Sequence, residues 1–144
     1  NINLSDNSNL IFCETSIFGR KAMSEEIKNI SFSDQWNIYI NSSLKHFEAI
    51  NIKGSMIDNY KNNYTFANKS SLSTILIFGE IIHTLESELR KATKNIENHY
   101  CEITKFDEKI IIRCIADDNY DLKKTLNYII KNIIHDKLPK SWDL

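Results

Sequence analysis

Residues 70–98 read SSLSTILIFGEIIHTLESELRKATKNIEN, and this stretch carries the strongest ordering signal in the chain. Its apolar side chains recur every seven residues in two rows, which consist of Ile75, Ile82, Leu89 and Ile96 and of Phe78, Leu85 and Ala92. Apolar positions that lie three and four residues apart fall on one face of a helix. The spacing therefore predicts one long central helix over about residues 70–98.

The two halves of this predicted helix differ in polarity. Residues 72–82 are apolar on nearly all sides, a pattern typical of a helix buried in a core. Residues 85–96 are amphipathic, with charged side chains on the outer face. Gly79 lies in the buried half and lets another element approach closely, at a cost of about 1 kcal/mol in helix propensity relative to alanine. We therefore expect the helix to serve packing rather than chemistry.

Residues 100–106 and 109–116 form the clearest hairpin pattern, because β-branched residues are dense in the second segment. The favoured register pairs Ile103 with Ile112, Cys101 with Cys114, and Glu102 with Arg113 on the opposite surface. Asp-Glu is a poor type I′ turn, so a four-residue connection is favoured over a two-residue one. The paired cysteines are interpreted as two small buried side chains, with a disulfide as the alternative.

The segments before residue 70 carry weaker patterns. Residues 9–18 suit an extended segment, residues 23–30 a short helix, and residues 51–68 a loop with one turn. Residues 34–50 are predicted to form a helix that begins after Ser33, which offers an N-cap. The alternative is a strand, because Trp36, Ile38 and Ile40 alternate with polar residues.

A last helix is expected over about residues 120–135, with Asp118 or Asn119 as its N-cap. The predicted fold class is therefore α+β. A small antiparallel sheet containing the 100–116 hairpin packs against the long helix at about 70–98 and the C-terminal helix. Residues 1–144 are expected to form a single soluble globular domain, since this length suits one hydrophobic core.

Composition excludes several classes of protein. The formal net charge is −1, and only three of the 18 basic residues are arginine, which disfavours a nucleic-acid binder. No run of 18 apolar residues is present, so no membrane span is expected. The 24 Ile, 17 Asn and absence of Val are typical of an AT-rich, bacterial genome. Three cysteines without a CxxC motif favour a cytoplasmic protein with reduced thiols.

No motif for catalysis, a cofactor or a metal rises above background. His83 with Glu86 has helical ligand spacing, but a metal site of that kind needs a second matching helix. Asp117 and Asp118 lie between a strand and a helix, where acids usually act as caps. We therefore predict a chain that is not an enzyme, with no cofactor, no metal and no catalytic residues.

The remaining functional signal is a group of aromatic and acidic side chains. Large rigid rings flanked by polar residues are typical of protein interfaces. The candidate partner-binding residues are Tyr60, Tyr64, Phe66, Asp117, Asp118 and Trp142.

The favoured hypothesis is a non-enzymatic protein-binding module, specifically a cytoplasmic immunity protein that neutralises a toxin. One alternative is a small enzyme or ligand-binding domain, with a polar pocket that joins His99 and His135 to Asp117 or Asp118. The other is a homodimeric structural or regulatory protein. The sequence leaves the oligomeric state and the partner open.

Overall fold

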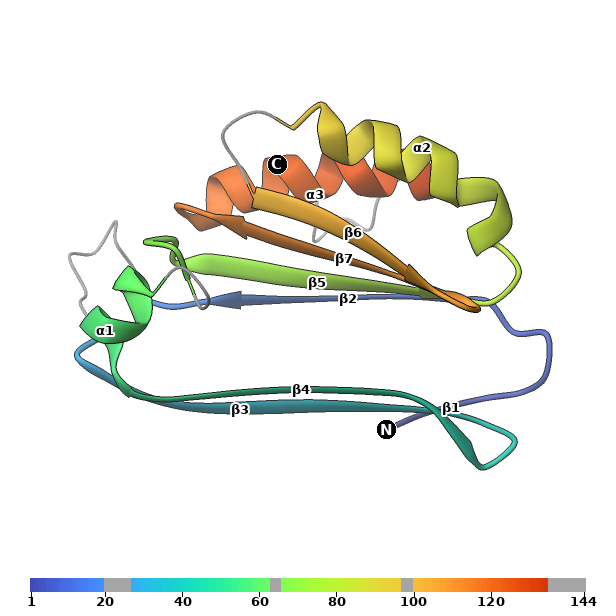
Figure 1. Ribbon diagram of the computed structural model, residues 1–144, viewed down its shortest axis with the longest axis horizontal. Helices are drawn as coiled ribbons and strands as arrows, with labels where there is room; N and C mark the ends of the chain where they lie inside the picture. The colour runs from blue at the N-terminus through green and yellow to red at the C-terminus, as the bar shows by residue number, and fades with distance from the viewer. Residues whose placement is uncertain (20–26, 63–65, 97–99, 135–144) are drawn as a thin grey trace.

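The computed structural model describes residues 1–19, 27–62, 66–96 and 100–134, which form three layers (Figure 1). The first layer is a sheet of β1 (Ile2–Leu4), β3 (Asn29–Ile40) and β4 (Ser43–Ser55), in the order β1-β3-β4. The second is an antiparallel sheet of β2 (Leu10–Ile17), β5 (Ser71–Phe78), β7 (Lys109–Ala116) and β6 (Tyr100–Phe106), in the order β2-β5-β7-β6. Helices α2 (Ile82–Lys94) and α3 (Asn119–Ile134) form the third layer.

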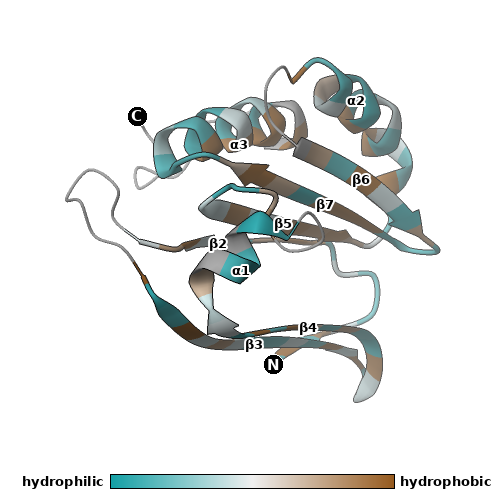
Figure 2. Ribbon diagram, turned by 60° about the vertical axis from the view of Figure 1, so that its left-hand side comes forward, coloured by the Kyte–Doolittle hydropathy of each residue, from teal (hydrophilic) through white to brown (hydrophobic). Residues whose placement is uncertain are grey.

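Three hydrophobic clusters pack the described layers together, one of them around Phe66. The largest lies between the second sheet and the helices, with Ile75, Ile77, Ile110 and Ile112 pointing at α2 and α3. Between the two sheets lies a smaller core of Trp36, Ile38, Leu76 and Ile111. Figure 2 shows β5 and β7 as largely hydrophobic ribbons, as expected for strands covered on both faces.

The prediction of one long helix over residues 70–98 is wrong for the first half of this segment. Residues 71–78 are the central strand β5, and the helix begins only at Ile82. Nearly all of this strand is buried on both faces, and its apolar run over residues 75–78 shows no alternation, so periodicity cannot distinguish it from a buried helix. Gly79 ends the strand at φ +102°, where a helix cannot continue. The sheet is also larger than the small one expected, since four strands share it.

The prediction of a helix over residues 34–50 is also wrong, and the alternative prediction of a strand is correct. The segment belongs to the long hairpin of β3 and β4, which turns at Asn41 and Ser42 with φ +46° and +63°. Trp36 and Ile38 face the second sheet, because residues two apart in a strand share a face. The predicted loop over 51–68 likewise gives way to the end of β4 and to α1 (Met56–Lys61).

Three other predictions agree with the structure. Residues 10–17 are extended, α3 occupies residues 119–134, and the 100–116 hairpin has the predicted register. Its connection is the two-residue turn rather than the four-residue one, with Asp107 at φ +36°. Most of the predicted helix over 23–30 lies outside the described residues, although Asn29 and Ile30 begin β3.

Candidate functional site

The two stacked sheets form an open groove on one side, where β4 lies over β7. This β4–β7 groove has a volume of about 280 Å³. Its lining comes from β4, β7 and the end of β6, and consists of His46, Phe47, Glu48, Phe106, Lys109, Ile111 and Arg113. In β6, the side chains of Glu102, Thr104 and Phe106 share the face turned toward the groove, and all three are exposed. The first sheet therefore leaves this edge of the second sheet uncovered.

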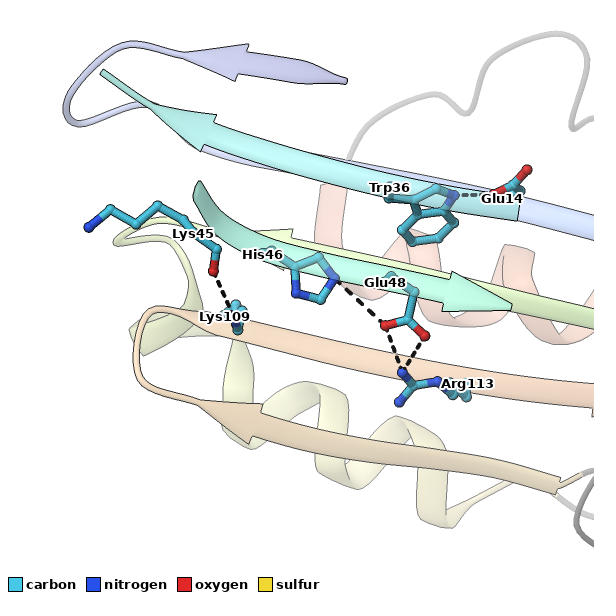
Figure 3. Close-up of polar contacts among 7 residues, drawn as sticks. All are labelled: Glu14, Trp36, Lys45, His46, Glu48, Lys109 and Arg113. Carbon is cyan, nitrogen blue, oxygen red and sulfur yellow. Dashed lines mark hydrogen bonds and ion pairs between the residues drawn. The ribbon is translucent and has the colours of Figure 1, made fainter. Parts of the chain in front are cut away.

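Polar links join β4 to β7 across the groove, as Figure 3 shows. Arg113 Nη2 donates to both carboxylate oxygens of Glu48, at 2.6 and 2.8 Å. Lys109 Nζ donates to the backbone carbonyl of Lys45 at 2.9 Å. Glu102 lies opposite Arg113 in the strand register, as predicted from the sequence, but the recorded ion pair of Arg113 is with Glu48 of the other sheet.

His46 lies at the inner wall of the groove with only 6% of its surface exposed. Its Nε2 atom is 3.7 Å from Glu48 Oε2 and has no hydrogen-bond partner among the described residues. Burial lowers the pKa of His46 below its ordinary value of 6.5, the charge of Lys109 lowers it further, and Glu48 opposes them. The imidazole is therefore neutral at pH 7.

This lowered pKa makes the stability of the fold dependent on pH. The unfolded chain takes up a proton on His46 as the pH falls through about 6.5, whereas the folded chain does so only at lower pH. We therefore expect the free energy of unfolding to fall from about pH 6.5 downward. Urea denaturation between about pH 7.5 and 5.5 measures this slope, and H46F should make it shallower. Equal slopes for the two proteins would contradict this assignment.

The opposite side of the sandwich has its own polar link. Trp36 Nε1 donates to the carboxylate of Glu14 on β2 (Figure 3), and the Trp36 ring meets Phe12 edge-on with centroids 4.7 Å apart. Burial raises the pKa of Glu14, and the hydrogen bond that its protonated carboxyl group donates to Asp34 raises it further, whereas the hydrogen bond from Trp36 lowers it. Aromatic packing thus accompanies the polar contacts on this side, whereas the groove side is open.

The groove chemistry disfavours a metal ion. His46 and Glu48 are its only His, Cys, Asp or Glu lining residues, and the cations Lys109 and Arg113 stand beside them. In the part of the chain that the structure describes, no group of three such side chains could hold a metal ion. Cys101 and Cys114 face one another across β6 and β7 and form a disulfide, the alternative that the sequence left open.

Three of the predicted partner-binding residues, Phe66, Asp117 and Asp118, do not line the groove. Phe66 is fully buried beside Phe18 and Met56, so its ring offers no surface to a partner. Asp117 accepts a hydrogen bond from Lys69 Nζ at 2.8 Å. Asp118 caps α3 by accepting from the backbone N–H of Asp121 at 2.9 Å, as its position between strand and helix predicted.

The structure does not describe the side chains of the other three candidates, Tyr60, Tyr64 and Trp142. Tyr60 lies in α1. Tyr64 and Trp142, with His99 and His135 of the alternative polar pocket, lie outside the described residues. Sequence reasoning missed His46 and Glu48 of the groove, because a helical reading of residues 34–50 hides their shared face with Trp36. No helix within the described ranges is long and apolar enough to cross a membrane.

Comparison with known proteins gives a consistent result. A family model described as UreD urease accessory protein matches residues 1–142. Urease accessory protein UreD of Rhizobium rhizogenes is 24% identical over 144 residues, which are 99% of this chain and 52% of the relative. The protein of the same name from Rhizobium leguminosarum bv. viciae is 25% identical over the same shares. That of Roseobacter denitrificans is 22% identical, over 99% of this chain and 51% of the relative.

These matches correct the functional hypothesis. The chain spans about half the length of the curated relatives it matches. The hypothesis of an immunity protein that neutralises a toxin is wrong, because the family and the relatives are urease accessory proteins. The small enzyme and the homodimeric regulator do not match either. An accessory protein is not itself an enzyme, which confirms the non-enzymatic prediction.

Proposed function

This chain belongs to the UreD urease accessory protein family, and we propose that it assists urease by binding a urease component as a protein partner. The observation that carries this proposal is the family match, which extends over residues 1–142 rather than over a local motif. The partner is then a protein, as the sequence predicted, but a component of urease takes the place of a toxin.

The surface chemistry supports a binding role. Charged and aromatic side chains from three strands line the groove. The lining contains no nucleophile beside a general base. Large exposed apolar side chains also occur on β4 and at the end of β6, where they lie at or near the groove. Exposed rings of this kind contribute to association through the area that they bury. We propose that this binding takes place in the cytoplasm, as the sequence predicted, although Cys101 and Cys114 form a disulfide rather than the reduced thiols on which that prediction relied.

A mixing experiment tests the proposed function. The purified 144-residue chain is combined with purified urease apoprotein, and the mixture is analysed by size-exclusion chromatography with light scattering. We expect a complex whose mass exceeds that of the apoprotein by a multiple of 16.8 kDa. The same chain carrying G79A, which should be strongly destabilised, serves as the matched control. Separate elution of the wild-type chain and the apoprotein at micromolar concentrations would contradict the proposal.

A further inference from the structure

We propose that the β4–β7 groove binds an extended segment of the partner protein, which brings a carboxylate to Lys109 and an apolar side chain to Phe106. This inference rests on the proposed function and adds the place and the chemistry of the contact.

The cations of the groove differ in their partners. Arg113 is neutralised by Glu48, which holds its guanidinium through two hydrogen bonds. Lys109 donates to the uncharged carbonyl of Lys45, and no ion pair joins it to an acid among the described residues. An ammonium group beside a groove gains more from a carboxylate than from a carbonyl, because charge-assisted hydrogen bonds are the stronger ones. Lys109 is therefore the position at which the groove can accept an external carboxylate.

Phe106 places an apolar surface beside this cation. It pairs directly with Lys109 across the hairpin and keeps 48% of its surface exposed. Ile111 lines the groove two residues further along the same face of β7. A partner side chain that packs on Phe106 would remove apolar surface from water next to the charged contact, whereas Ile111 is only 4% exposed and already belongs to the core between the sheets. Glu102 lies four positions from Phe106, opposite Arg113, so it disfavours a second carboxylate at that end.

The extended form of the segment follows from the two strand edges. In the sheets formed by the described residues, β4 and β6 each lie at an edge. An edge strand leaves backbone N–H and C=O groups on one side without a strand partner. An extended segment can pair with such an edge while its alternate side chains enter the groove. One carboxylate and one apolar side chain at nearby positions then match Lys109 and Phe106.

Paired variants test the inference in the complex with urease apoprotein. K109Q removes the charge of Lys109 but keeps a donor for the Lys45 carbonyl, and F106S removes the exposed ring. The matched control is K105Q, which makes the same charge change on the opposite face of the hairpin, where Lys105 pairs with Glu86. We expect K109Q and F106S each to weaken binding about tenfold by isothermal titration calorimetry, and K105Q to leave it unchanged. Wild-type affinity in both groove variants would overturn the inference and leave the proposed function standing.

A second measurement examines the groove without urease. The ¹⁵N-labelled chain is titrated with the acetylated, amidated tripeptide leucine–glutamate–leucine and with its glutamine counterpart. We expect chemical shift changes confined to β4, β6 and β7, with the glutamate peptide binding about tenfold more tightly. Equal affinity of the two peptides, or no localised change up to the solubility limit, would overturn the inference. This holds even if the apoprotein does not bind and the proposed function itself fails.

Discussion

Replacing Gly79 with alanine is expected to destabilise the fold by about 2–4 kcal/mol. Gly79 has φ +102°, a backbone conformation that strains any residue with a Cβ atom. A Cβ there would also lie 2.6 Å from the Ser8 carbonyl oxygen and 2.6 Å from Asn9 Oδ1. Asn9 Oδ1 already accepts the backbone N–H of Ile81, so it fixes the start of α2 and cannot move away without cost.

Gly54 provides the matched control for this variant. It has the same φ of +102°, but a Cβ at this position would meet nothing within 4 Å. G54A therefore carries the backbone strain without the overlap and should cost about 1–2 kcal/mol less than G79A. Urea denaturation of both variants measures the difference. A continuous helix through residue 79 would instead make G79A stabilising by about 1 kcal/mol, and that result would contradict the strand β5.

Truncating Phe66 to alanine is expected to cost about 3–5 kcal/mol. Its side chain has no exposed surface and packs against Phe18, with ring centroids 5.0 Å apart, and in a cluster with Ile52 and Met56. This cluster lies where α1 follows β4, so the ring fixes that end of the sandwich. The loss combines the removed apolar contacts with the cavity left behind.

Tyr120 is the matched aromatic position for this test. It lies on α3 with 65% of its surface exposed. Y120A should change the free energy of unfolding by no more than about 0.5 kcal/mol, as is usual for a surface substitution. Chemical denaturation of the two variants compares the core ring with the surface ring. An equally small effect of F66A would show that Phe66 belongs to the surface, as the sequence suggested.

The 100–116 hairpin shows what local sequence can predict. Its register was predictable because each strand must keep its apolar residues on the buried face and its polar residues on the other. A shift by one residue would expose the Ile103–Ile112 pair. The helix α3 was predictable for a similar reason, since its cap and its inward apolar row occur within one short segment.

The larger errors arose where burial removed the periodic signal. Residues 71–78 are buried on both faces, so their apolar side chains fit a helix as well as a strand. In β3, Trp36 and Ile38 do alternate, but Ile40 and Leu44 also satisfy helical spacing across the turn at Asn41. Only the second sheet, which packs against Trp36 and Ile38, decides between the two forms.

The groove was beyond sequence reasoning for a further reason. Glu48 and Arg113 are 65 residues apart, and Lys45 and Lys109 are 64 apart. Their contact depends on the stacking of two sheets, which no local spacing records. The Phe106–Lys109 pair is local and was present in the predicted register, but its value as a surface appears only once the edge of β6 is seen to be uncovered.

Hydrogen exchange of the chain with saturating urease apoprotein tests most directly whether this protein acts by binding through the groove. Backbone amides that become buried or paired in a complex exchange more slowly. We expect slower exchange in β4 and in the β6–β7 hairpin, with no change along the exposed side of α3. Exchange that is unaltered in every described element, or protected only on α3, would contradict the account.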